Sequence, residues 1–106
     1  MKVSIVRGGG YAGLVTTSTV DSAELPPEDA EELKRRVDQA GAFHLPEKLA
    51  AHGREADRFS YELTFDDGER THTVRAAESA LPDDVRSLIA WINERVKPRA
   101  GRERSE

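Results

Sequence analysis

The chain has 106 residues, of which 34% are charged, and 16 Lys and Arg against 20 Asp and Glu give a formal net charge of −4. This length supports one hydrophobic core with a radius of gyration of about 13 Å. The acidic balance argues against nucleic-acid binding, which depends on clustered Lys and Arg. Because the sequence contains no cysteine, disulfides, thiolate metal sites and cysteine nucleophiles are excluded.

The sequence also carries an expectation about location. A single Lys and five further residues precede the glycines near the N-terminus, an apolar run too short for a secretory signal. No stretch approaches the roughly 20 apolar residues that a membrane-spanning helix requires. We therefore expect a cytoplasmic protein that does not contact a membrane, and we take it to be a monomer.

Two extended runs flank a glycine-dense segment near the N-terminus. Residues 1–6 and residues 14–20 are rich in Val, Ile and Thr, which suit a pleated surface. The segment between them has four glycines in six residues: Gly8, Gly9, Gly10 and Gly13. Glycine reaches positive φ without a Cβ clash and lets another backbone approach closely. The pattern predicts a β-hairpin whose tip carries Tyr11.

A first helix is predicted from Pro27 to about Ala40. Proline is tolerated in the first turn of a helix, and the acids that follow it lie near the positive end of the helix dipole. Leu33 and Val37 belong to a narrow apolar stripe with helical spacing. Gly41 stands where a left-handed C-cap is expected.

The second half of the chain repeats this architecture. An irregular return over residues 42–46 leads to an exposed polar loop over residues 50–57. Apolar and polar residues then alternate from Phe59 to Asp66, which predicts a strand, and the Asp-Gly pair that follows is a strong hairpin signal. Residues 70–76 return as the fourth strand, and residues 83–96 have the apolar face of a second helix.

These elements predict an α+β fold. Four antiparallel strands with one apolar face need a cover, and two amphipathic helices supply it, which gives a two-layer sandwich in the order ββαββα. Residues 1–96 are expected to form a single domain, and residues 97–106 a disordered tail. The predicted core consists of Val3, Ile5, Leu33, Val37, Phe59, Tyr61, Leu63, Phe65, Val85, Leu88, Ile89 and Ile92.

The residues give little sign of catalysis. The separations of His44, His52 and His72 match neither a helical pair of ligands nor a known zinc motif, so we expect no metal. The acid pairs at residues 66–67 and 83–84 are explained by a hairpin turn and a helix start. Loops that bind phosphate join a strand to a helix, whereas the glycine segment leads into a strand. We expect neither an enzyme nor a bound cofactor.

The order and spacing of several short motifs resemble the Emfourin family over nearly the whole chain to about Val96. The motifs are residues 9–14 (GGYAGL), 20–21 (VD), 25–28 (LPPE), 42–46 (AFHLP), 57–61 (DRFSY) and 81–82 (LP). The resemblance implies a small bacterial protein that inhibits thermolysin-like zinc metallopeptidases and is typically encoded beside a protealysin-like peptidase. This chain has Tyr11 where the family more often has Phe.

The resemblance implies a partner-binding site at the glycine-rich aromatic turn. Its residues are Gly9, Gly10, Tyr11, Ala12, Gly13 and Leu14. A thermolysin-like cleft binds an extended peptide and has a hydrophobic pocket, which Tyr11 or Leu14 would fill while glycine backbone groups bond along the cleft. The loop at residues 50–57 is a second candidate contact.

Two other interpretations remain open at this point. The glycines also fit a tight hairpin turn with no contact role, in which Tyr11 packs on the rim of the sheet. A non-inhibitory interaction module or small adaptor subunit has the same composition as an inhibitor. A peptidase gene beside this one favours inhibition over the adaptor.

Overall fold

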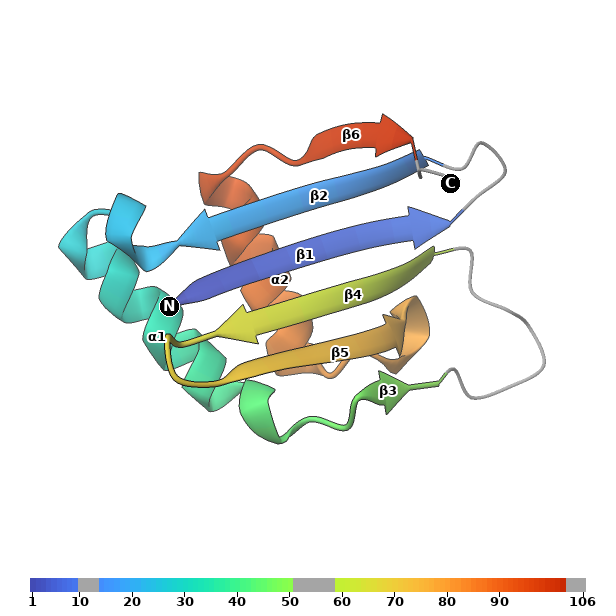
Figure 1. Ribbon diagram of the computed structural model, residues 1–106, viewed down its shortest axis with the longest axis horizontal. Coiled ribbons are helices and arrows are strands. Elements are labelled where there is room, and N and C mark those ends of the chain that lie inside the picture. Colours follow the sequence, from blue (N-terminus) through green and yellow to red (C-terminus); the bar gives the residue numbers. More distant parts are fainter. Residues whose placement is uncertain (10–13, 51–58, 103–106) are drawn as a thin grey trace.

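The computed structural model describes residues 1–9, 14–50 and 59–102. Its strands are β1 (Lys2–Gly9), β2 (Leu14–Asp21), β3 (Lys48–Leu49), β4 (Phe59–Asp66), β5 (Thr71–Ala77) and β6 (Arg99–Arg102). Its helices are α1 (Pro27–Gln39) and α2 (Asp83–Arg95), with the short 3-10 helices η1 (Ser22–Glu24), η2 (Ala42–His44) and η3 (Glu78–Ala80). In this part of the chain the strands form one six-stranded sheet in the order β3-β5-β4-β1-β2-β6, and both α-helices lie against one of its faces (Figure 1).

The two predicted hairpins and the two predicted helices are confirmed. β1 pairs antiparallel with β2 on one side and with β4 on the other, and β4 pairs antiparallel with β5. In this register Val3 lies between Val20 and Phe65, so the apolar positions of three strands face the helices together. The two hairpins therefore form the centre of an α+β sandwich.

The prediction of four antiparallel strands in the order ββαββα is wrong, because both edges of the described sheet carry a further short strand. β3 lies parallel to β5, and the amide of Arg75 donates to the carbonyl of Glu47 over 2.8 Å. β6 pairs antiparallel with β2. Edge pairing satisfies backbone groups and needs no apolar side chain, so short polar segments can join a sheet without a sequence signal.

β6 falls in the tail that was expected to be disordered. Arg99 lies opposite Thr17 and Arg102 opposite Leu14, so residues 99–102 extend the sheet beyond β2. The remaining residues of that tail, 103–106, lie outside the described residues.

Helix α1 shows why local sequence signals located the helices well. Pro27 occupies its first turn and Leu33 and Val37 are its buried residues. The predicted C-cap is confirmed, since Gly41 follows the helix with φ 61° and ψ 37°. This left-handed conformation carries no Cβ penalty at glycine.

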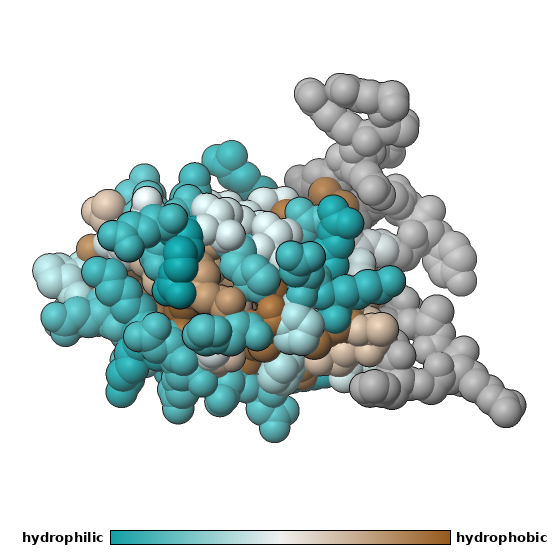
Figure 2. Space-filling view, turned by 60° about the horizontal axis from the view of Figure 1, so that its bottom comes forward, coloured by the Kyte–Doolittle hydropathy of each residue, from teal (hydrophilic) through white to brown (hydrophobic). Residues whose placement is uncertain are grey.

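The core lies between the sheet and the helices. All predicted core residues are buried except Phe59 and Tyr61, which are half-buried. Of these two, Tyr61 packs against the core. The prediction missed several buried residues, and these are Val20, Ala42, Val74, Ala76, Leu81 and Trp91. Figure 2 shows a mostly hydrophilic surface (teal) over the described residues, with hydrophobic residues (brown) visible as a seam between polar side chains.

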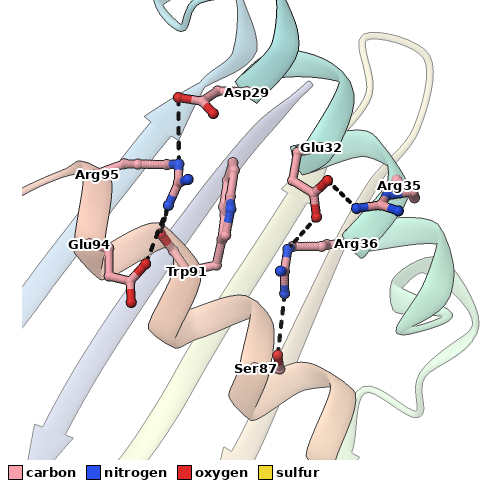
Figure 3. A network of polar contacts seen from close by, with 8 residues as sticks. All are labelled: Asp29, Glu32, Arg35, Arg36, Ser87, Trp91, Glu94 and Arg95. Atoms are coloured by element: carbon pink, nitrogen blue, oxygen red, sulfur yellow. Dashed lines mark hydrogen bonds and ion pairs between the residues drawn. The ribbon is translucent and has the colours of Figure 1, made fainter.

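Trp91 joins the two helices on the outside of this core. It is only 6% exposed, because the guanidinium groups of Arg95 and Arg36 lie over its ring at 4.0 and 5.7 Å from the centroid (Figure 3). Arg95 also forms an ion pair with Asp29 of α1 over 3.5 Å, and Arg36 donates to Ser87 of α2 over 3.2 Å. The arginines shield the ring with their planar, weakly hydrated heads.

Replacing Phe65 with alanine should strongly destabilise the fold. The ring is fully buried between the layers, so its removal leaves a cavity and should lower the free energy of unfolding by about 3–5 kcal/mol. Thr19→Ala, on the exposed side of β2, is the control and should change stability by less than about 0.5 kcal/mol. Urea denaturation measures both, and an equal loss in the two variants would contradict this core assignment.

Candidate functional site

Several strand ends meet at one end of the sheet, which we call the loop end. It consists of Gly9, Leu14, Phe59 and Arg102, which border the segments outside the described residues. Gly9 is the register partner of Phe59, and Leu14 is the partner of Arg102. In Figure 1 these ends of β1, β2, β4 and β6 lie on the same side of the molecule. The chain that enters the glycine-rich turn from β1 is thus adjacent to the first residue of β4, which follows the polar loop.

The structure places only part of the predicted partner-binding site. Gly9 is the exposed last residue of β1 and has φ 126°, and Leu14 is the first residue of β2. Gly10, Tyr11, Ala12 and Gly13 lie outside the described residues, as does most of the candidate loop at 50–57. Gly8, the first residue of the glycine-dense segment, is a paired residue inside β1.

Gly8 allows close packing within the sheet. It is the register partner of Val15 in β2 and of Ser60 in β4, and a Cβ added to it would lie 3.3 Å from Cγ1 of Val15. Gly8 is one of the residues that line an open hollow of about 370 Å³, as are Val6, Val15 and Ser60. The glycine segment therefore has a structural role in β1 before the turn begins.

Arg7 lies on the other face of β1, next to the loop end. Its Cζ is 3.9 Å from the centroid of the Phe59 ring, and its Nη2 is 4.0 Å from Oε2 of Glu78 in η3. Sequence reasoning missed these residues as neighbours of the site. The signal was present in β1, where strand alternation puts the charged Arg7 on the same face as Val3 and Ile5.

The histidines do not gather in the described structure. His44 is exposed in η2, and Nε2 of His72 lies 2.7 Å from the carbonyl oxygen of Leu45. His52 lies outside the described residues. Within the described ranges, no group of three or more His, Cys, Asp or Glu side chains could hold a metal ion.

The acid pairs have the structural roles that their positions predicted. Asp66 accepts a hydrogen bond from the amide of Gly68, and Asp67 accepts from the amides of Glu69 and Arg70, which fixes the β4–β5 turn. Asp83 and Asp84 lie in the first turn of α2. The β4–β5 turn is at the opposite end of β4 from Phe59 (Figure 1), so these carboxylates are remote from the loop end.

Two carboxyl groups titrate below their usual range because of local bonds. Hydrogen bonds from the backbone amides of Arg70 and Glu69 are the main causes that lower the pKa of Asp67, and the side chain of Arg70 adds to them. A hydrogen bond from Arg35 is the main cause that lowers the pKa of Glu32, and Arg36 contributes. Both carboxylates stabilise local structure, one in a turn and one on a helix.

The fold and the loop end define a small α+β protein with an open-faced sheet and a glycine-rich hairpin. None of the helices in the described residues is both long enough and apolar enough to span a membrane. The chain matches the family model described as Emfourin over residues 5–93 and belongs to that family, as its motifs predicted. This membership points to a role as a metallopeptidase inhibitor. No curated protein and no solved structure gives a match.

Acid should weaken the fold partly through Asp67. Its folded-state pKa lies below the ordinary value for an aspartate, so its contribution to stability is present above about pH 4 and is lost as the pH falls through the lowered pKa. Asp67→Asn keeps an oxygen acceptor but removes the charge, so it should be less stable than the wild type at pH 7 and lose less stability on acidification. Urea denaturation between pH 7 and pH 2 measures this, and parallel profiles would contradict it.

Proposed function

We propose that this protein inhibits a thermolysin-like or protealysin-like zinc metallopeptidase by inserting the glycine-rich turn at residues 9–14 into the active-site cleft. The observation that carries the proposal is the match to the Emfourin family over residues 5–93. The geometry supports it, because the strands on both sides of the turn end at the loop end of the sheet. The proposed place of action is the cytoplasm, with the chain as a monomer.

The support beneath the turn favours insertion as a preformed unit. β1 is held on one side by β2 and on the other by β4. A binding segment on such a support loses little conformational entropy when it binds, so more of the contact energy appears as affinity. Tyr11 then serves as the aromatic anchor, since aromatic side chains bury a large area at the centre of interfaces.

The proposed mechanism blocks the cleft and does not need a bond to the catalytic zinc. The six residues of the turn contain neither histidine nor cysteine nor a carboxylate, the side chains that most often bind zinc. An extended peptide cleft instead offers backbone partners and side-chain pockets. Inhibition by occlusion should therefore be competitive with the peptide substrate.

A non-inhibitory interaction module is the second candidate. The observation that favours it is the sheet face opposite the helices, which none of the described elements covers (Figure 1). It carries hydroxyl side chains at Ser4, Thr64 and Thr73, which are successive register partners in β1, β4 and β5. Thr17 of β2 adds a fourth hydroxyl on this face. A partner bound here would leave peptide hydrolysis unchanged, which separates this candidate from inhibition.

Titration of the purified chain against thermolysin and a cognate peptidase, with a peptide substrate, should show stoichiometric loss of hydrolysis. The double variant Tyr11→Ala, Gly13→Ala should be weaker by about tenfold or more, because the loss of a buried aromatic anchor costs at least about 1.4 kcal/mol. Tyr11→Phe retains the ring and is the matched control. Undiminished hydrolysis at a large excess of wild-type chain would refute the inhibitor proposal. Equal potency of the wild type and the double variant would show that the contact lies elsewhere on the protein.

Gly9→Ala should weaken inhibition beyond its effect on stability. Gly9 has φ 126° and Gly41 has φ 61°, so alanine is strained at both positions and should lower the free energy of unfolding by roughly 1–2 kcal/mol. Only Gly9 borders the turn. We therefore expect a higher inhibition constant for Gly9→Ala and an unchanged one for the control Gly41→Ala, and equal inhibition constants would argue against a role for the exit from β1.

A further inference from the structure

Arg7 is an exception in the pattern of β1. Val3, Ile5 and Arg7 alternate along the strand and share its helix side, and the first two are buried in the core. The Arg7 side chain is 42% exposed, because it lies at the loop end, two residues before the strand ends at Gly9. The guanidinium group of Arg7 therefore lies at the boundary between the buried core and the exposed end of β1.

The side chain of Arg7 connects three elements. Its guanidinium lies over the ring of Phe59, the first residue of β4, with Cζ 3.9 Å from the centroid. It also approaches the carboxylate of Glu78 in η3, with 4.0 Å between Nη2 and Oε2. Stacking on an aromatic face and pairing with a carboxylate are both contacts that the planar guanidinium favours.

The η3 segment that carries Glu78 is itself fixed to α2. Nη2 of Arg86 donates to the carbonyl of Glu78 over 2.7 Å, and Nε of Arg86 donates to the carbonyl of Leu81 over 3.1 Å. Through Glu78 and Arg86, the contact of Arg7 reaches from the end of β1 to the helix layer. The position of the Phe59 ring is thus set from both layers of the sandwich.

This arrangement is not optimal for stability. Nε of Arg7 is buried and makes no hydrogen bond to any described residue. A buried donor without a partner lowers stability. The comparable Arg95 places its ring contact at 4.0 Å and has hydrogen-bond and ion-pair partners in Trp91 and Asp29. Unsatisfied polar groups and departures from the local pattern concentrate at functional sites.

We propose that Arg7 is a positioning residue for inhibition, which holds Phe59 at the start of β4 and thereby fixes the end of β1 from which the binding segment departs. The proposal rests on the proposed function. The register supports it, because Gly9, the residue before the turn, is the partner of Phe59. Arg7 acts through these neighbours, and it reduces the conformational freedom that the peptidase would otherwise have to restrict on binding.

The test compares Arg7→Ala with Arg95→Ala in the full chain. Each variant removes an arginine that stacks on an aromatic ring and pairs with a carboxylate, but Arg95 belongs to the helix layer (Figure 3). We expect the inhibition constant to rise about tenfold or more for Arg7→Ala and to stay within about twofold of wild type for Arg95→Ala. Thermal unfolding of the two variants is measured in parallel, and Arg7→Ala should lower the midpoint by no more than Arg95→Ala.

Substitutions at Phe59 separate positioning from general destabilisation. Phe59→Tyr keeps a ring beneath the guanidinium and should retain potency, whereas Phe59→Leu should match Arg7→Ala. The double variant Arg7→Ala, Phe59→Leu should be no weaker than either single variant, because both remove the same contact. Additive losses, or a loss of potency that follows the midpoint of unfolding in all variants, would overturn the proposal.

A measurement on the free protein distinguishes this proposal from the proposed function. In Arg7→Ala, the backbone amide signals of Gly8, Gly9 and Ser60 should shift and broaden in NMR spectra, and in Arg95→Ala they should match wild type. If wild-type chain fails to inhibit, the proposed function is lost, and the spectra still decide whether Arg7 fixes these strand ends. Unchanged spectra or unchanged potency in Arg7→Ala would refute the role of Arg7.

Discussion

The double pairing of β1 is the constraint on which the rest of the structure depends. With β2 on one side and β4 on the other, Val3 is placed beside Val20 and Phe65, and all three face the helices. A shift of one residue in either pairing would turn these side chains to solvent. The hydrophobic pattern of three strands therefore fixes the register, and the register determines which residues meet at the loop end.

The helix layer covers only part of β1. Val3 and Ile5 are buried at 1% and 3% exposure, whereas Arg7 is partly exposed and Gly9 is exposed. Along one strand the chain thus passes from core to surface, and the residue types change with it. In the first half of β1, burial in the core determines the residue types. In the second half, close backbone approach and charge determine them, since Gly8 packs against Val15 and Arg7 against Phe59.

Local signals in the sequence predicted the helices and hairpins, because helical spacing, proline-acid starts and an Asp-Gly turn act within a few residues. Local signals did not predict the features that depend on contacts between distant parts of the chain. β3 and β6 pair through backbone groups at the sheet edges, and Phe59 looked like a core residue although it is half-buried at the loop end, under the guanidinium of Arg7. For the candidate site, the sequence predicted the glycine-rich turn, whose residues 10–13 lie outside the described residues. The pairing of Gly9 with Phe59 could not be predicted, because it depends on contacts between distant segments.

The sheet also limits how the proposed contact can form. Gly8 is paired with β2 and with β4, so its backbone groups are engaged within the sheet and do not extend the proposed contact beyond Gly9. The edge strands are short, with two residues in β3 and four in β6, and the exposed Lys48 and Arg99 lie on them. Short, charged edges disfavour the addition of a further strand. In the proposed inhibition, a partner therefore meets the turn after Gly9 and the side chains at the loop end, and we expect the affinity of this contact to depend on how firmly Phe59 and β1 hold that turn.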